Sequence, residues 1–186
     1  MTTFAHKPVI EGDRTVLRPI VAADAESMFA DLADEEGMRL TGSQGTFDRP
    51  TIEAWTASRG DTDDRLDLAV TDPVDGSWLG EVVINEVDPD NRSCNFRIAL
   101  SAHARNRGVG TEATRLLVDY VFEEIEPAVN RISLGVYTFN PRAIAVYERV
   151  GFVREGVLRQ TLRWDGAFVD EVVMAMLRSD WETGRR

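Results

Sequence analysis

A short glycine-containing stretch in the middle of the chain has the composition of a phosphate-binding loop. It reads Arg105-Asn106-Arg107-Gly108-Val109-Gly110 and lies between a strand-like segment that ends at Leu100 and a helix that we expect to begin near Thr111. Two glycines one residue apart let backbone N–H groups turn inward, because no Cβ atom is in the way. The start of the helix adds unpaired N–H groups and the positive end of its dipole. This combination predicts an anion site for a diphosphate.

The same loop also fits the dinucleotide fingerprint G-x-G-x-x-A, read from Gly108 to Ala113. A dinucleotide-binding fold places this loop after its first strand and an acidic residue roughly 20 residues further on. Here about a hundred residues precede the loop, and the next strand ends in Tyr137-Thr138-Phe139-Asn140, which contains no acid. The spacing therefore disfavours a nucleotide-dependent oxidoreductase.

A second motif, Asn140 to Tyr147, reads N-P-R-A-I-A-V-Y and leads into Gly151-Phe152. With Arg105 three residues before Gly108, the two motifs resemble the [Q/R]-x-x-G-x-[G/A] loop and the N-x-x-[S/A]-x-x-x-Y…GF segment of the GCN5-related N-acetyltransferases, the GNAT superfamily. Their order and separation match the family as well. The resemblance covers nearly the whole chain and implies a single N-acetyltransferase domain over residues 1–186.

Two further segments resemble the RimJ/RimL-type branch of this superfamily. They are Leu17-Arg18-Pro19 near the start of the chain and Asp165-Gly166, followed by Asp170, near its end.

The resemblance implies roles for several of these residues. The backbone from Ile98 to Leu100 would lie beside the pantetheine arm, where its N–H groups could polarise the thioester carbonyl. Asn140 would contact that arm, although its position is also that of an ordinary helix N-cap. Tyr147, two helical turns further on, would protonate the coenzyme A thiolate, and the alternative is a core tyrosine. The expected donor-binding residues are Ile98, Ala99, Leu100, Arg105, Asn106, Arg107, Gly108, Val109, Gly110, Thr111, Asn140, Arg142 and Tyr147.

The general base departs from the family pattern. Many relatives of the RimJ/RimL-type branch carry a Glu on the strand before the loop, and the matching position here is Asn95, whose amide is not a useful proton acceptor. We take Glu81, on the preceding strand, as the substitute base. An exposed strand carboxylate without a catalytic role is the alternative.

These assignments predict an acetyl-CoA-dependent N-acetyltransferase in which a primary amine attacks the thioester directly, within a ternary complex and without a metal ion. Acetyl-CoA is the donor substrate. Protein N-termini, amino acids, polyamines and amine-bearing antibiotics all occur as acceptors among relatives, so the acceptor stays open. A non-catalytic acyl-CoA-binding or sensor module is the alternative, and a homodimer is compatible with either reading.

Composition and charge exclude other classes of function. The chain has 186 residues, of which 43% are hydrophobic and 28% charged, which is typical of one globular domain. Its net charge of −11 argues against a nucleic-acid partner. Apolar runs fall short of the roughly 18 residues of a membrane span, and the N-terminal sequence predicts no export signal, so we expect a cytoplasmic protein. Cys94, the single cysteine, lies in a strand-like run and is expected to be buried and structural.

The sequence pattern predicts a mixed, largely antiparallel α/β (α+β) fold, with a sheet of about seven strands and about four flanking helices. In the helix after the loop, an apolar stripe can pack on the sheet. The segment from Ala33 to Arg49 predicts a mobile polar loop. Strands are expected at 9–18, 66–71, 78–87, 93–100, 131–138, 152–164 and 167–177, and helices near 24–32, at 50–55, from 111 and at 141–150.

Overall fold

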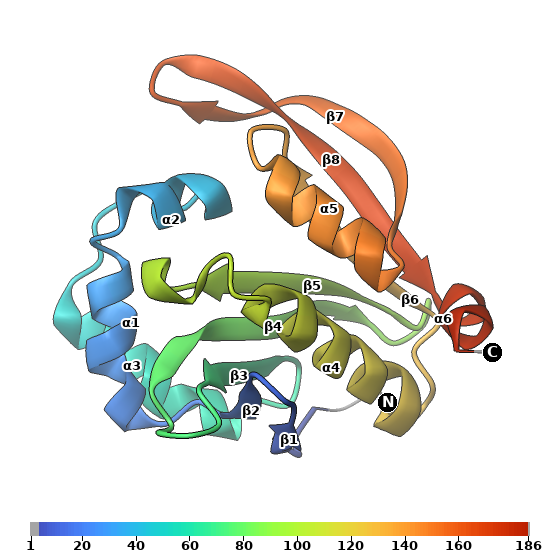
Figure 1. Cartoon of the computed structure of the whole chain (residues 1–186), viewed down its shortest axis with the longest axis horizontal. Helices are drawn as coiled ribbons and strands as arrows, with labels where there is room; N and C mark the ends of the chain where they lie inside the picture. Colours follow the sequence, from blue (N-terminus) through green and yellow to red (C-terminus); the bar gives the residue numbers. More distant parts are fainter. Residues whose placement is uncertain (1–3, 186) are drawn as a thin grey trace.

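The chain forms one sheet with helices on both of its faces (Figure 1). The computed structural model describes residues 4–185. Within them the strands are β1 (Ile10–Glu11), β2 (Val16–Pro19), β3 (Leu66–Thr71), β4 (Trp78–Asp88), β5 (Ser93–Leu100), β6 (Arg131–Tyr137), β7 (Val153–Trp164) and β8 (Ala167–Leu177). The helices are α1 (Ala25–Asp31), α2 (Glu35–Thr41), α3 (Arg49–Ser58), α4 (Val109–Glu124), α5 (Pro141–Val150) and α6 (Arg178–Gly184).

The strands lie in the order β1-β2-β3-β4-β5-β6-β8-β7. Every neighbouring pair is antiparallel except β5 and β6, which are parallel, so the predicted mixed and largely antiparallel sheet is confirmed. The predicted number of strands was one too low, because the expected first strand folds back on itself. The Gly12 amide donates to the Thr15 carbonyl (2.9 Å), and Ile10 pairs with Leu17 across the turn.

The parallel strands β5 and β6 separate part of the way along. Their pairing covers Ser93–Asn95 on β5 and Arg131–Ser133 on β6. Beyond Asn95, β5 continues to Leu100 and β6 to Tyr137 with no further register partners between them among the described residues. Figure 1 shows the β7–β8 hairpin diverging from β4 and β5. Beyond Asn95 on β5 and Ser133 on β6, the two strands thus form the sides of a wedge, and the backbone groups that face it are available to a ligand.

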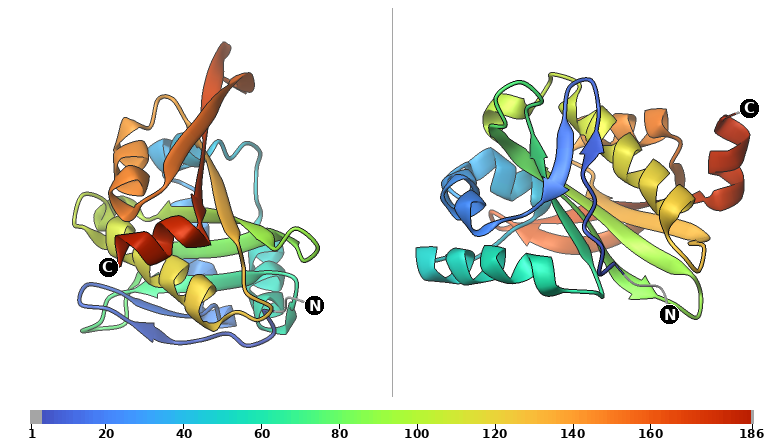
Figure 2. Two further views of the ribbon diagram at one scale, coloured as in Figure 1. Left: turned by 90° about the vertical axis from the view of Figure 1, so that its right-hand side faces the viewer. Right: turned by 90° about the horizontal axis from the view of Figure 1, so that it is seen from below.

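The helices α4 and α5 cover one face of the sheet, and α1 and α3 cover the other (Figure 2). The predicted stripe of α4 is confirmed, since Ala113, Leu117 and Val121 are fully buried in the main core. On the opposite face, Met28 of α1 and Trp55 of α3 pack against a small cluster of Ile20, Ala69 and Trp78. The apolar cluster beneath α1 and α3 is much smaller than the main core beneath α4 and α5.

Three segments differ from the sequence-based expectations. The predicted loop from Ala33 to Arg49 contains helix α2, which ends at the left-handed Gly42 (φ 66°). The predicted short helix from Pro50 to Trp55 extends over Arg49–Ser58, with Asp48 accepting a hydrogen bond from the Thr51 amide (2.9 Å). The C-terminal helix α6 was not predicted, and Trp181 docks it by donating from Nε1 to Asp119 (2.7 Å).

The predicted cap and turn positions are confirmed. Asn140 accepts a hydrogen bond from the Ala143 amide (3.1 Å) at the start of α5, and Gly151 ends that helix with φ 119°. Asp165 and Gly166 both have positive φ, which suits a two-residue turn between β7 and β8. Across residues 4–185, no helix combines the length and the hydropathy of a membrane span.

Candidate active site

The loop before α4 has the backbone geometry of an anion-binding site. Asn106 (φ 63°) and Gly108 (φ 83°) both adopt the left-handed conformation, which turns successive N–H groups to one side. Gly108 is the N-cap of the 16-residue helix α4, and its neighbour Val109 is buried in the core. Residues 106–108 are exposed. A buried anchor and an exposed turn therefore hold the unpaired N–H groups of the helix start at the surface.

The turn between β1 and β2 is attached to the first turn of α4 through Glu112. Its carboxylate accepts hydrogen bonds from the backbone amides of Asp13 (3.2 Å) and Arg14 (2.8 Å) and from the Thr15 hydroxyl (3.2 Å). This contact brings the Arg14 side chain to the loop, where its Cδ lies 3.4 Å from the position that a Cβ on Gly108 would occupy. Neither Arg14 nor Glu112 was predicted, since a contact this distant in sequence leaves no local signal.

Tyr147 lies at the inner end of the wedge. Its ring packs edge-on against Phe96, at a centroid distance of 6.2 Å, and against Phe152, at 5.9 Å. Phe96 is the first β5 residue beyond the segment paired with β6. The Tyr147 side chain is buried, and its hydroxyl forms no side-chain hydrogen bond within residues 4–185. Burial raises the pKa of Tyr147 above its usual range, so the phenol stays protonated at neutral pH.

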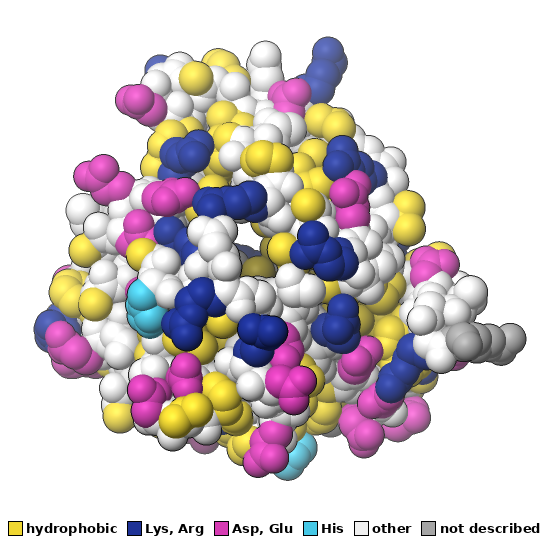
Figure 3. All heavy atoms as spheres, in the orientation of Figure 1, with side chains coloured by type: hydrophobic (Ala, Val, Ile, Leu, Met, Phe, Trp, Pro, Cys, Tyr) yellow, Lys and Arg dark blue, Asp and Glu magenta, His cyan; other side chains and the backbone are white. Residues whose placement is uncertain are grey.

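Arginine side chains surround the mouth of the wedge although the whole chain is acidic. Figure 3 shows dark blue side chains around a central hollow, on the face where α4 and α5 begin. Arg142, on the first turn of α5, donates to the Asn106 side chain (2.9 Å) and so joins α5 to the loop. Arg105 donates from Nε to the Leu100 carbonyl (3.1 Å) and holds the loop against the end of β5. The loop, β5 and α5 thus meet at one hollow.

Glu81 lies on the other face of the sheet, beside the predicted donor-binding strand. It pairs with Ala99 on β5 and with Ala69 on β3, so its side chain shares the face of those two residues. Its Oε2 atom is buried without a hydrogen-bond partner within residues 4–185. Burial and the nearby Asp67 raise the pKa of Glu81 to about 7, against the opposing effect of Arg97 and Arg65. The sequence-based alternative of an exposed carboxylate does not hold.

Asn95, which occupies the position of the expected base, has a structural role instead. Its amide nitrogen donates to the Asn85 side-chain oxygen (2.9 Å), directly across the β4–β5 pair. Cys94 next to it is buried, as predicted, and burial raises the pKa of its thiol to about 12. Neither residue offers a proton acceptor at neutral pH. Among the carboxyl groups near Glu81, which include Asp67, Glu81 is the one whose pKa is raised to about 7.

Helix α2 lies across the open end of the wedge and contacts both β5 and β6. Asp34 and Glu36, at its beginning, form ion pairs with Arg105, and Glu36 also pairs with Arg142 (3.1 Å). At its end, the Tyr137 ring packs on Gly42 so closely that a Cβ there would lie 2.4 Å from the ring. The sequence predicted only a polar loop here, so neither the helix nor its acidic contacts with the two arginines were expected.

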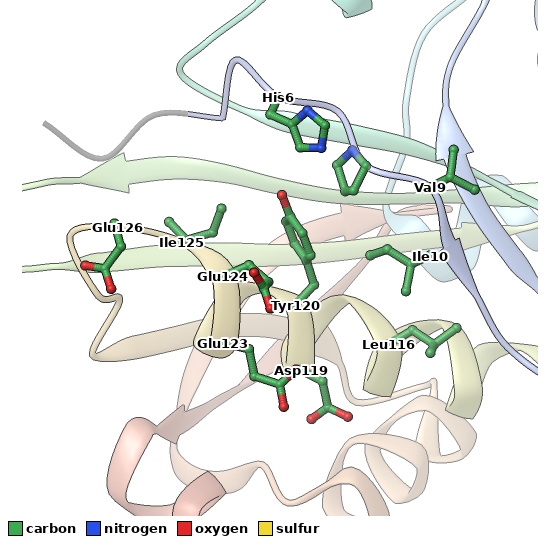
Figure 4. Close-up of a pocket in the computed structure, with 11 residues that line it drawn as sticks. His6, Val9, Ile10, Leu116, Asp119, Tyr120, Glu123, Glu124, Ile125 and Glu126 are labelled. Atoms are coloured by element: carbon green, nitrogen blue, oxygen red, sulfur yellow. The ribbon is translucent and has the colours of Figure 1, made fainter.

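Two hollows flank these elements. One, of about 730 Å³, lies between α2 and the tip of the β7–β8 hairpin and is lined by Leu32, Glu35, Glu36, Met38, Arg39, Ser43, Gln44, Gly45, Trp164 and Asp165. The other lies between the N-terminal segment and the C-terminal half of α4, with His6, Tyr120 and Glu123 on its wall (Figure 4). None of the predicted site residues lines either hollow, but Glu36 of the first hollow forms ion pairs with Arg105 and Arg142 at the wedge.

A comparison with protein families gives a match over residues 14–153, which include β5, the loop, α4 and α5, to the family described as Acetyltransferase (GNAT) domain. The chain belongs to the GNAT acetyltransferases. Their N-acetyltransferases use acetyl-CoA as donor, and the residues at the wedge fit it: the loop offers N–H groups and arginines for a diphosphate, and the splayed strand offers backbone groups for an arm. Within residues 4–185, His, Cys, Asp and Glu side chains form no group of three or more that could hold a metal ion.

Several curated GNAT proteins are similar in sequence. The putative ribosomal N-acetyltransferase YdaF of Bacillus subtilis is 33% identical over 108 residues, a match that spans 58% of each chain. YokL, an uncharacterized prophage-derived N-acetyltransferase of the same organism, is 25% identical over 92% of this chain and 94% of its own. The L-amino acid N-acetyltransferase AaaT of Escherichia coli is 30% identical over 56% of this chain and 65% of its own. The names of these relatives thus include a putative ribosomal and an L-amino acid N-acetyltransferase.

Solved structures of the family share the fold. Spermidine N-acetyltransferase from Vibrio cholerae, in complex with CoA and spermine, superposes with a TM-score of 0.83 at 22% identity, over 92% of this chain and 99% of that one. A GCN5-related N-acetyltransferase from Brucella melitensis gives a TM-score of 0.78 at 25% identity, over 95% and 81% of the two chains. These similarities confirm the predicted GNAT fold.

Proposed function

We propose that this chain transfers acetyl from acetyl-CoA to a primary amine by direct attack within a ternary complex. One observation carries the proposal: the unpaired stretch of β5, the anion-binding loop and the start of α5, the helix that carries Tyr147, meet at a single hollow. The titratable carboxyl of Glu81 lies on the opposite face of the same strand pair. A donor site and an acceptor site would then share β5 as their common wall.

Different residues of the donor site would bind different parts of acetyl-CoA. N–H groups from Arg105 to Thr111, helped by Arg142, would bind the diphosphate. Backbone N–H groups from Ile98 to Leu100 would polarise the thioester carbonyl, and Asn140 would contact the pantetheine arm while it caps α5. Two observations support this assignment: in the part of the chain that the structure describes, β5 has no partner strand on its β6 side beyond Asn95, and Arg142 is exposed.

Two residues would handle the protons. Glu81 would accept a proton from the amine, whose nitrogen then attacks the carbonyl carbon. When the carbon–sulfur bond breaks, the departing thiolate would receive the proton of the Tyr147 hydroxyl. The nitrogen would release its second proton as the amide forms, and solvent would carry this proton to restore the Tyr147 hydroxyl. The products are an N-acetylated amine and free coenzyme A. A peptide N-terminus, an amino acid or another small amine fits this scheme.

An acceptor screen that follows release of the free coenzyme A thiol tests the proposal. We expect thiol release above the no-acceptor rate with at least one amine, together with an acetylated product detected by mass spectrometry. The non-catalytic alternative predicts that acetyl-CoA binds, as measured by calorimetry, but that no amine accelerates thiol release. An absence of acetyl-CoA binding would contradict both.

The same preparation tests two further expectations. We propose that residues 1–186 act as one domain, which a single cooperative unfolding transition would support. A homodimer stays a prediction, and sedimentation equilibrium would distinguish it from a monomer.

A further inference from the structure

The carboxylate of Glu36 lies between two guanidinium groups of the donor site. Its Oε1 atom is 3.1 Å from Nη2 of Arg142, and its Oε2 atom is 3.7 Å from Nη1 of Arg105. Arg142 in turn donates to the side chain of Asn106, in the loop that we assign to the diphosphate. Two guanidinium groups around one anion are the arrangement that proteins use for phosphate as well as for carboxylate.

The two acidic residues at the start of α2 differ in how firmly they are held. Arg105 and Asp34 are both largely buried, with side-chain exposures of 14% and 22%. Glu36 and Arg142 are exposed, at 53% and 56%. Exposed ion pairs contribute little, about 0.2–1 kcal/mol. The contacts of Glu36 can therefore be replaced at small cost while the Asp34–Arg105 pair stays in place.

We propose that Glu36 is an internal competitor of the donor's phosphates and that donor binding displaces it from Arg142 and Arg105. A diphosphate carries more negative charge than a carboxylate and offers more acceptor oxygens, so it binds the two guanidinium groups more strongly. The inference rests on the proposed function, because it assigns a second state to the same donor site.

Displacement of Glu36 would also change the hollow between α2 and the tip of the β7–β8 hairpin. Glu36 lines the hollow between α2 and the hairpin tip, together with Met38 and Arg39 of the same helix. The far end of α2 is fixed by Gly42 against Tyr137 and by Arg39, whose guanidinium lies 4.5 Å from the centre of the Phe139 ring. The first turn of α2 would then shift while Asp34, paired with Arg105, and Gly42, packed on Tyr137, stay in place. Donor binding would therefore reshape the hollow between α2 and the hairpin tip.

The variant Glu36→Gln tests this competition, with Glu35→Gln as the matched control. Both remove one negative charge from the same turn of α2, but Glu35 has no ion pair or hydrogen bond of its side chain among the described residues. Calorimetry with coenzyme A alone is the measurement, because it needs no acceptor. We expect Glu36→Gln to bind coenzyme A about two- to fivefold more tightly than Glu35→Gln, the factor that corresponds to an exposed ion pair.

Hydrogen exchange provides a second measurement. Saturating coenzyme A should speed amide exchange at residues 35–38 of wild type and slow it at residues 98–110, while in Glu36→Gln the exchange at 35–38 should already be fast without ligand. Equal affinity of the two variants, or slower exchange at 35–38 on binding, would overturn the competition. Failure of the wild type to bind coenzyme A at all would overturn the proposed function instead.

Discussion

Burial sets the protonation states of Tyr147 and Glu81 in the same direction but with different consequences. It raises the pKa of both groups, because both charged forms are anions. Tyr147 consequently stays protonated at neutral pH, which is the form that a proton donor needs. Glu81, with a pKa of about 7, is half ionised near neutrality, which is suited to a general base.

Replacement of Tyr147 by Phe separates its proposed role from a structural one. A positioned general acid contributes about 10²–10⁴-fold, so we expect kcat of Tyr147→Phe to fall by that range with little change in acetyl-CoA affinity. Tyr120→Phe is the control, since Tyr120 lies in the hollow of Figure 4, away from the wedge. Wild-type turnover in a folded Tyr147→Phe would show that another group protonates the thiolate.

The pH dependence of kcat tests Glu81. A base must be deprotonated to act, so wild-type activity should rise with pH through about 7, the pKa of this carboxyl. In Glu81→Gln that limb should disappear and kcat should fall by about 10²-fold or more. An unchanged profile in the variant would assign the limb to a different group.

The same carboxyl makes stability depend on pH in a defined direction. Folding raises its pKa from 4.5 to about 7, so the native state holds this proton more tightly than the unfolded state does. The stabilisation that this bound proton gives to the folded state is fully present below pH 4.5 and is lost as the pH rises through about 7. We expect the difference in Tm between Glu81→Gln and wild type, measured by calorimetry, to be more positive at pH 8.5 than at pH 5, because only the wild type loses stability as this carboxyl ionises. A pH-independent difference would contradict a raised pKa.

At the scale of elements, the donor loop depends on one backbone conformation that glycine adopts without strain. Gly108 has φ 83°, and a Cβ at this position would lie in ordinary contact with Arg14 rather than in a clash. A side chain there is therefore tolerated by the neighbouring residues but would project from the loop, where phosphate oxygens must approach the backbone.

Gly108→Val should accordingly weaken acetyl-CoA binding by about tenfold or more while the chain still folds. Gly76→Val is the matched control, because Gly76 has φ 72° and no atom within 4 Å of its Cβ position, in the turn before β4. Both variants should lose about 1–2 kcal/mol of stability from the left-handed backbone. Equal affinities in calorimetry would remove the loop from the donor site.

The elements with local signals could be predicted, and those stabilised by distant contacts could not. The stripe of α4, the Asn140-Pro141 start of α5 and the Asp165-Gly166 turn are each encoded within a few residues. By contrast, α2 has seven residues, one of them Gly37, and its start is attached through the ion pair of Asp34 with the distant Arg105.

The candidate site was predicted to a similar extent. The loop and α5 motifs indicated residues that lie together around one hollow, and their contacts with the donor stay predictions. The alternation of β5 is the same on both sides of Asn95, so nothing in its sequence indicates where the strand leaves β6. The buried environment of Glu81 and the bridging position of Glu36 also depend on residues from other elements.

At the scale of the whole molecule, the charge is divided between two kinds of surface. The chain has a net charge of −11, yet arginines surround the donor hollow (Figure 3). The hollow between α2 and the hairpin tip includes Glu35, Glu36 and Asp165. This division suits an anionic donor and a cationic acceptor that approach from different sides.

The acceptor itself should be an amine of low pKa. At pH 7 an α-amine with a pKa near 8 needs about 1.4 kcal/mol to become neutral, whereas a lysine near 10.4 needs about 4.6 kcal/mol. A base with a pKa of about 7 is better matched to the first. We therefore expect α-amines to have a higher kcat/KM than lysine side chains in matched peptides at pH 7. Faster acetylation of lysine would indicate a stronger base than Glu81.

The separation of β5 from β6 makes the sheet incomplete without its donor. A ligand that binds only the folded chain stabilises it by about 2.7 kcal/mol at a hundred times its dissociation constant. The thermal stability of this protein is therefore a property of the chain and the donor together, and it rises with the logarithm of the free donor concentration. In a cell the lifetime of the enzyme would follow the supply of acetyl-CoA, so depletion of the donor would lower the amount of enzyme as well as its rate.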